Sequence, residues 1–131
     1  LLKTRQPVVL ATVTHNKDKE QSLSARGVTI LHTKKSAGGV DLADLLKQLH
    51  AMEIRHLLVE GGAALTGAFL DERLADKLVF YVAPIIIGGR QAMGAVGGRG
   101  VDTPQRAVSV KRMMMQQIGG DFFIEGDLVY S

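Results

Sequence analysis

The stretch His56-Leu57-Leu58-Val59-Glu60-Gly61-Gly62-Ala63-Ala64-Leu65-Thr66-Gly67-Ala68-Phe69-Leu70 decides the fold of this chain. Its apolar start predicts a buried strand over residues 56–59, and the residues after the two glycines predict a helix over residues 63–73. Glycines at a strand-to-helix turn carry no Cβ, so the backbone can come close to a ligand. The first N–H groups of such a helix lack partners and attract a phosphate. Glu60 is expected at the mouth of the same crevice, where α/β sheets bind their ligands.

The rest of the chain predicts strands and helices in alternation, followed by strands alone. Strands are expected over residues 7–12, 28–31 and 77–83, helices over 16–25 and 41–52, loops over 36–39 and 88–100, and a terminal hairpin over 108–118 and 122–130. Gly119 and Gly120 lie at the turn of that hairpin. This order predicts an α/β fold whose sheet is parallel at first and antiparallel at its edge.

Composition narrows the class of protein. A chain of 131 residues is one domain or part of one. The lack of Cys excludes thiolate zinc sites and disulfides, and it fits a reducing cytoplasm. No apolar run approaches the ~20 residues that cross a bilayer, so no membrane partner is expected. The net charge of +3 comes from scattered Lys and Arg without an aromatic platform, which disfavours nucleic acid as a partner.

Several segments of the chain are similar to a known family. They are Leu57-Leu58-Val59-Glu60-Gly61-Gly62-Ala63-Ala64-Leu65-Thr66-Gly67-Ala68-Phe69-Leu70, Leu74-Ala75-Asp76-Lys77-Leu78, Tyr81-Val82-Ala83-Pro84-Ile85-Ile86-Ile87-Gly88-Gly89 and Ile118-Gly119-Gly120-Asp121-Phe122-Phe123. Together they resemble the reductase half of the bifunctional riboflavin-biosynthesis deaminase–reductase. The resemblance implies a three-layer αβα, dihydrofolate-reductase-like fold with a mostly parallel mixed sheet and a C-terminal antiparallel hairpin. It also implies NADPH-dependent reduction of 5-amino-6-(5-phosphoribosylamino)uracil, a phosphorylated pyrimidine, to its ribitylamino product.

The same resemblance implies roles for particular residues. The family's glycine turn falls on Gly61 and Gly62, and the start of its cofactor-binding helix falls on the residues that follow. These are Ala63, Ala64, Leu65, Thr66, Gly67 and Ala68, which are implied to cradle the dinucleotide phosphates. The family's acidic residue falls on Glu60 and is implied to contact substrate. From the residues alone, a carboxylate at this position could equally be a helix cap, and no catalytic side chain is identified.

The family pattern also extends beyond this chain. Its domain begins with further strands that hold the substrate and part of the nicotinamide pocket, and nothing in residues 1–131 corresponds to them. We therefore expect residues 1–131 to be the C-terminal part of a single reductase domain, incomplete at its N-terminus. A zinc-dependent deaminase domain fused upstream and a homodimer are the further partners that the resemblance suggests.

Thr12, Thr14 and His15 end the first predicted strand, on the side where a parallel sheet binds ligands. Their hydroxyls and imidazole could meet the 2′-phosphate of the cofactor. A helix cap for residues 16–25 is the favoured interpretation. The other three histidines are not spaced as metal ligands, so no metal site is predicted.

Two further segments allow more than one interpretation. The run Met113-Met114-Met115 is expected to fill the core, with a dimer seam formed by the terminal strands as the second choice. The loop over residues 88–100 holds six glycines together with Arg90 and Arg99. It could be a phosphate cradle, but a flexible surface loop is the favoured interpretation.

Two rival functions stay open. The chain could belong to another dihydrofolate-reductase-like reductase that acts on a different pterin or pyrimidine. It could also be a cofactor-binding or assembly domain without turnover of its own.

Overall fold

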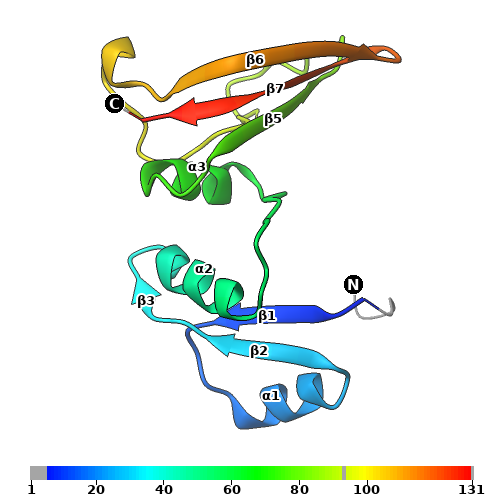
Figure 1. The fold of residues 1–131 in the computed structure, drawn as a ribbon, viewed down its shortest axis with the longest axis vertical. Coiled ribbons are helices and arrows are strands. Elements are labelled where there is room, and N and C mark those ends of the chain that lie inside the picture. The colour runs from blue at the N-terminus through cyan, green and yellow to red at the C-terminus, as the bar shows by residue number, and fades with distance from the viewer. Residues whose placement is uncertain (1–5, 93, 131) are drawn as a thin grey trace. The chain divides into compact units, whose positions relative to one another are not determined.

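The structure is a computed structural model that describes residues 6–92 and 94–130. The chain divides into two compact units, residues 1–58 and residues 59–131, and each is described by itself. Figure 1 shows the helices and strands of both units. In the described part of the chain, no helix is both long and apolar enough to cross a bilayer.

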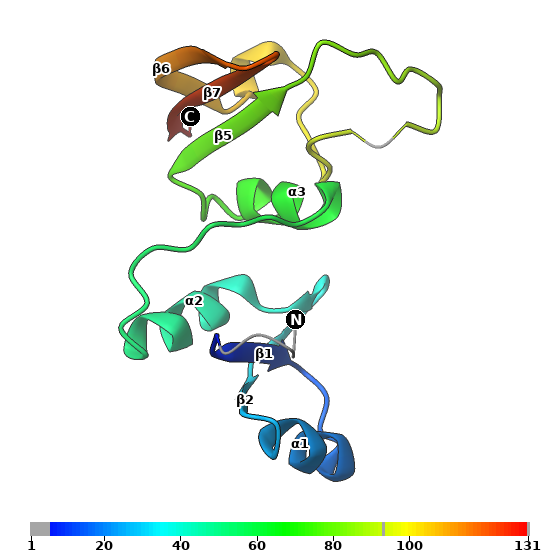
Figure 2. The same cartoon turned by 90° about the vertical axis from the view of Figure 1, so that its right-hand side faces the viewer.

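The first unit is a small α/β arrangement. Its elements are β1 (Val8–Thr12), α1 (Lys17–Ser24), β2 (Val28–His32), β3 (Lys35–Ser36), β4 (Gly39–Val40) and α2 (Leu42–Ala51). β1 and β2 pair in parallel, and β3 and β4 form a short antiparallel pair. Figures 1 and 2 show α1 and α2 on opposite sides of the β1–β2 pair. The core of this unit is formed by Val28 on β2 and by Leu42 and Leu49 on α2.

Polar side chains set the starts of both helices in this unit. The Asn16 side chain accepts a hydrogen bond from the Lys19 N–H at 3.0 Å, and the Asp41 side chain accepts one from the Asp44 N–H at 2.9 Å. Each bond satisfies an amide that the helix itself leaves without an acceptor. The helices predicted over residues 16–25 and 41–52 are thus confirmed to within the cap residues.

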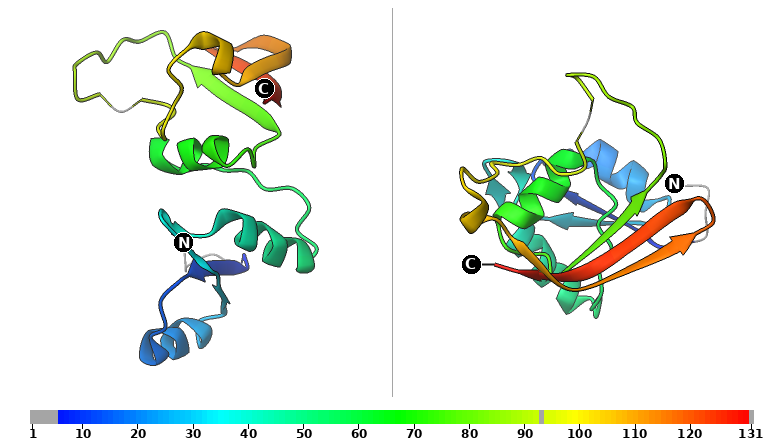
Figure 3. Two further views of the ribbon diagram at one scale, coloured as in Figure 1. Left: turned by 90° about the vertical axis from the view of Figure 1, so that its left-hand side faces the viewer. Right: turned by 90° about the horizontal axis from the view of Figure 1, so that it is seen from above.

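The second unit holds one helix and an antiparallel sheet. Its elements are α3 (Ala63–Asp71), β5 (Lys77–Val82), the 3₁₀ turn η1 (Pro104–Arg106), β6 (Ser109–Ile118) and β7 (Asp121–Val129). The strands follow the order β5-β7-β6. Figure 3 shows the long β6–β7 hairpin with β5 beside β7. The predicted terminal hairpin is confirmed, and Gly119 provides the positive φ of 62° at its turn.

The strand predicted over residues 56–59 is wrong. Residues 54–62 have no regular structure, and Leu57 and Leu58 are 47% and 72% exposed. A strand needs a neighbour that satisfies its N–H and C=O groups. Within the described residues, no strand pairs with this segment. This apolar run therefore lacks the inter-strand hydrogen bonds that would make it a strand.

Two further expectations differ from the structure. Parallel pairing was expected to dominate, but only the β1–β2 pair is parallel among the described strands, and the β3–β4, β5–β7 and β6–β7 pairs are antiparallel. Met113, Met114 and Met115 on β6 are 66%, 47% and 65% exposed, so they do not fill a core in this chain. The reason is that β6 is the edge strand of a three-stranded sheet, and every residue of β6 is exposed.

Candidate functional site

The glycine turn before α3 is open to solvent. Glu60, Gly61 and Gly62 are all exposed, and Glu60 makes no hydrogen bond or ion pair with any other described residue. A Cβ on Gly61 would lie 2.5 Å from Leu65 Cδ2, closer than real contacts allow. Glycine at this position therefore lets the turn fold down onto the first turn of the helix. Gly62, the N-cap residue, has open space where a side chain would point.

The start of α3 presents amides that lack acceptors. The Gly62 carbonyl accepts hydrogen bonds from the Leu65 N–H at 3.0 Å and the Thr66 N–H at 3.2 Å. Among the described residues, the amides of Gly62, Ala63 and Ala64 have no acceptor, and no side chain caps the helix. Such amides and the helix dipole together attract an anion. The geometry of this end of α3 therefore suits a phosphate group.

The end of the glycine-rich loop packs directly on α3. The Gly97 N–H donates to the Ala63 carbonyl at 2.9 Å, at the first turn of the helix. A Cβ on Gly67 would lie 2.2 Å from the carbonyl carbon of Gly97, so the two backbones touch. At the last turn, the Arg99 N–H donates to Asp71 Oδ2 at 2.8 Å, and the Arg99 guanidinium donates to the Asp71 carbonyl. Figure 2 shows the yellow end of this loop returning to α3. Residues 97–99 are therefore anchored, unlike a free surface loop.

The residues predicted to hold a cofactor are exposed to different degrees. Ala64 and Leu65 are exposed, and Ala63, Thr66 and Ala68 are half-buried. Gly67 is buried beneath Gly97, so its role in this structure is to let the loop approach the helix. The exposed residues of the predicted site are therefore Glu60, Gly61, Gly62, Ala64 and Leu65.

A hollow of about 540 Å³ lies at the other end of α3. It is lined by Leu70, Asp71, Arg73, Val96, Gly97, Arg99, Gly100, Val101, Arg106, Ala107, Val108 and Tyr130. Its arginines already have neighbours, because Arg99 pairs with Asp71, Arg106 pairs with Asp102, and Arg73 lies over the Tyr130 ring. Burial raises the pKa of Tyr130, whose hydroxyl donates to the Ala75 carbonyl at 2.7 Å. No residue of the glycine turn lines this hollow, whereas four residues of the loop over residues 88–100, including Arg99, do.

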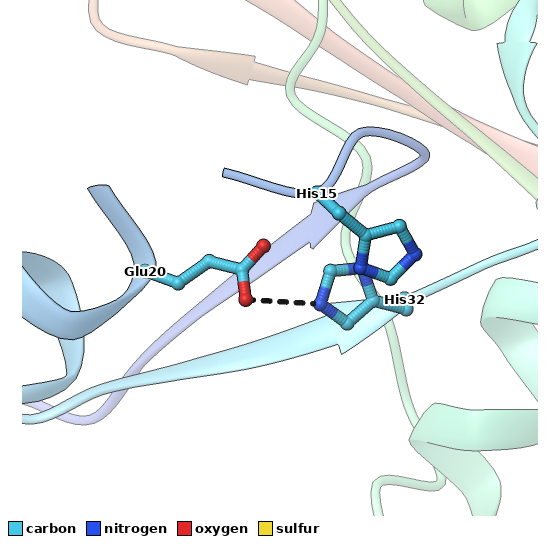
Figure 4. A group of neighbouring side chains, drawn as sticks. All are labelled: His15, Glu20 and His32. Atoms are coloured by element: carbon cyan, nitrogen blue, oxygen red, sulfur yellow. Dashed lines mark ion pairs between the residues drawn. The ribbon is translucent and has the colours of Figure 1, made fainter. Parts of the chain in front are cut away.

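At the carboxyl end of β1, residues that are distant along the chain lie close together in space. The Thr12 and Thr14 hydroxyls lie 3.0 Å apart, and Asn16 caps α1 in their place. The His15 ring stacks on the His32 ring with centroids 3.9 Å apart. His32 is also 3.5 Å from Glu20, between Nε2 and Oε2 (Figure 4). The parallel register that places Thr12 opposite His32 explains this neighbourhood, and spacing along the chain could not reveal it.

The Glu20 carboxylate is held by more than one group. Its Oε1 accepts the Asn16 N–H at 2.9 Å. This backbone hydrogen bond is the main reason that the pKa of Glu20 is lowered, and the nearby His32 adds to the effect. The carboxylate therefore stays ionised and stays oriented toward the two histidines.

Comparison with known proteins shows relatives along nearly the whole chain. The family model described as RibD C-terminal domain matches residues 1–124. The riboflavin biosynthesis protein RibD of Actinobacillus pleuropneumoniae is 35% identical over 117 residues, which are 89% of this chain and 31% of that protein. A 2,5-diamino-6-ribosylamino-4(3H)-pyrimidinone 5′-phosphate reductase of Methanothermobacter thermautotrophicus is 37% identical over 86 residues, which are 66% of this chain and 40% of that protein.

Solved structures show the same likeness. RibD of Acinetobacter baumannii superposes with a TM-score of 0.74 at 25% identity, over 93% of this chain and 31% of that one. The riboflavin biosynthesis reductase of Saccharomyces cerevisiae superposes with a TM-score of 0.71 at 20% identity, over 95% of this chain and 52% of that one, which bears on the fold alone. The chain spans about a third of the RibD relatives that it matches. Because the family model covers almost all of its residues, this chain belongs to the RibD C-terminal domain family.

Proposed function

We propose that this chain is part of an NADPH-dependent reductase of riboflavin biosynthesis. The proposed reaction reduces 5-amino-6-(5-phosphoribosylamino)uracil to its ribitylamino product. Membership of the RibD C-terminal domain family supports this, as do relatives named as riboflavin biosynthesis proteins and as a pyrimidinone phosphate reductase. The proposal depends mainly on the amides of Gly62, Ala63 and Ala64, which have no acceptor among the described residues and lie at a turn with open space beside Gly62.

Different residues at the turn would bind the cofactor and the substrate. The amides at the start of α3 would hold the cofactor's diphosphate, and Gly61 would keep the turn close to the helix. When bound, the nicotinamide supplies the hydride, and the protein's contribution is to orient the reactants. The exposed Glu60 carboxylate would accept hydrogen bonds from the substrate's sugar hydroxyls or amine.

Other features of the proposal rest on the family. The proposed fold is the three-layer dihydrofolate-reductase-like arrangement, and residues 1–131 are proposed as the C-terminal part of one reductase domain. A homodimer, an upstream zinc deaminase domain and a cytoplasmic location complete the proposal. The RibD relatives support the upstream domain, because this chain matches only about a third of their length.

The test is an assay of NADPH oxidation with the phosphoribosylaminouracil substrate, using the full-length protein that contains this chain. We expect turnover by the full-length protein. Calorimetry measures in parallel whether the isolated 131-residue chain binds NADPH. Binding of NADPH without turnover by the full-length protein would favour a cofactor-binding or assembly domain. Turnover of only another pterin or pyrimidine would identify a different reductase.

Glu60→Gln in the full-length protein tests the substrate contact. The amide keeps the size of the side chain but removes its charge and replaces one acceptor with a donor. We expect a higher KM for the substrate, or a lower kcat, with the affinity for NADPH unchanged. Unchanged kinetics would remove Glu60 from the site.

A further inference from the structure

Three potential metal ligands from three different segments of the chain meet in the first unit. His15 lies in the connection after β1, Glu20 on α1, and His32 at the end of β2. One ligand atom from each lies within 4.8 Å of the others, and Figure 4 shows the carboxylate and both rings gathered at one place. We propose that His15, Glu20 and His32 bind a divalent transition-metal ion, with Zn²⁺ as the best match. This inference does not depend on the proposed reductase activity.

The donor set is one that zinc uses. Zn²⁺ binds imidazole nitrogen and carboxylate oxygen at about 2.0–2.2 Å, in tetrahedral geometry. Two ligand atoms at such distances are therefore about 3.4 Å apart. His32 Nε2 and Glu20 Oε2 are 3.5 Å apart, so this pair already has the required separation. The remaining ligand atoms lie within 4.8 Å of one another and need to close by at most about 1.4 Å to reach this separation.

Hydrogen bonds outside the cluster hold its members in place. Glu20 Oε1 accepts the Asn16 N–H at 2.9 Å, which leaves Oε2 directed at His32. The His32 carbonyl accepts a hydrogen bond from Gln48 Nε2 at 2.9 Å, which fixes the backbone at the end of β2. Partners of this kind orient metal ligands in known sites. The ordered backbone lowers the entropic cost of bringing the ligands together.

The two imidazole rings must tilt to bind one ion. They are nearly parallel, with 17° between their planes, and the lone pair of an imidazole nitrogen lies in the plane of the ring. Parallel lone pairs do not converge, so one ring has to rotate out of the stack. His15 is exposed in a connecting loop and has room to rotate. Three protein ligands would leave one tetrahedral position for water.

The test uses the 131-residue chain without any histidine tag, titrated with Zn²⁺ in a calorimeter. We expect one ion per chain, a higher Tm in the presence of Zn²⁺, and changed NMR signals for the His15 and His32 rings as they unstack. Co²⁺ gives a second readout, because a tetrahedral nitrogen and oxygen site absorbs visible light. The chain has no Cys to provide a competing sulfur site.

Variants show whether the three residues form the site. His15→Ala, His32→Ala and Glu20→Gln should each weaken Zn²⁺ binding at least tenfold and abolish the Co²⁺ absorption. Glu20→Gln retains an oxygen that can accept the Asn16 N–H, so loss of binding in this variant reports on the charged ligand. His50→Ala is the matched control, because His50 is exposed on α2 and lies outside the cluster.

Two results would overturn the proposal. One is the absence of 1:1 binding, which would leave His32 and Glu20 as an ion pair only. The other is binding that persists in His15→Ala or that is lost in His50→Ala. Circular dichroism of each variant identifies any that fail to fold, and the NMR shifts of the unaltered chain still decide the question in that case.

Discussion

At the scale of single residues, Gly62 is the most informative position. It caps α3 without a side-chain hydrogen bond, has φ −69° and ψ 173°, and has nothing within 4 Å of where a Cβ would lie. Any residue can adopt this extended backbone conformation. Replacing Gly62 therefore changes the chemistry at the start of α3 without disturbing the packing.

Gly62→Asp tests whether a diphosphate binds at this helix end. The aspartate carboxylate should cap the helix by accepting hydrogen bonds from the backbone amides at the start of α3, so Tm should stay equal or rise. The same carboxylate occupies the place of the anion and repels it. We expect the affinity for NADPH to fall by about tenfold or more, equivalent to about 1.4 kcal/mol, in calorimetry.

Gly62→Asn is the matched control, because it has the same shape and capping ability without the charge. It should lose much less affinity than Gly62→Asp. Equal affinity of the aspartate variant and the unaltered chain would place the diphosphate elsewhere.

At the scale of elements, the contact between α3 and the glycine-rich loop depends on the lack of side chains at Gly67 and Gly97. Gly67→Ala would place a methyl group 2.2 Å from the Gly97 carbonyl carbon, and the loop would have to move. We expect a loss of about 1–3 kcal/mol in the free energy of unfolding, measured by urea denaturation.

Gly120→Ala serves as the control for that change, because its methyl group meets nothing within 4 Å and Gly120 has no positive φ. It should leave the stability close to that of the unaltered chain. If both variants unfold at the same urea concentration, the loop does not pack on α3 in solution.

Asp44 links α2 to the segment after β2 and makes the stability of this contact depend on pH. Its carboxylate accepts the Lys34 N–H at 3.0 Å and Gln48 Nε2 at 2.9 Å, and these bonds lower the pKa of Asp44 in that order of importance. A pKa lowered by folding means that the ionised group stabilises the fold above its unfolded pKa, near pH 4. This contribution is lost as the pH falls through the lower, folded pKa.

Asp44→Asn should therefore have a lower Tm than the unaltered chain at pH 7, with the difference shrinking below about pH 4. Thermal unfolding followed by circular dichroism at several pH values measures this difference. Lys35→Gln, an exposed residue that is not among the groups shifting the pKa of Asp44, controls for a general loss of charge. A Tm difference that stays constant from pH 7 to pH 3 would contradict the assignment.

At the scale of the whole molecule, little apolar surface is fully buried. Among the described residues, the buried hydrophobic side chains are Val28, Leu42, Leu49 and Phe69, whereas many large hydrophobic residues are exposed. On the sheet of the second unit, these include Tyr81, Met113, Met115 and Ile118. Exposed apolar surface of this extent is typical of a face that contacts another chain or domain.

The expected homodimer can be tested on β6. Alternate residues of a strand point to opposite faces, so Met115 and Gln116 lie on different sides of the sheet. If the face that carries Met115 is the dimer seam, Met115→Glu should weaken self-association by at least tenfold in light scattering. Gln116→Glu adds the same charge on the other face and should have little effect. A monomer at all concentrations, or equal effects of both changes, would exclude this seam.

The sequence alone determined the local structure of the chain. Asn16 and Asp41 define helix starts, Gly119 defines the hairpin turn, and the two glycines define the start of α3, because these signals act between residues that are close along the chain. The amides without acceptors at the start of α3 follow from the same local rules.

Only the tertiary structure decided which distant residues meet. It left residues 56–59 without a strand partner, it placed Gly97 against Gly67, and it brought His32 to His15 and Glu20. Each outcome depends on pairing or packing between segments that are separated along the chain. Apolar patterns and short-range propensities carry no information about such partners, because strand pairing and close backbone contact are set by the arrangement of whole elements.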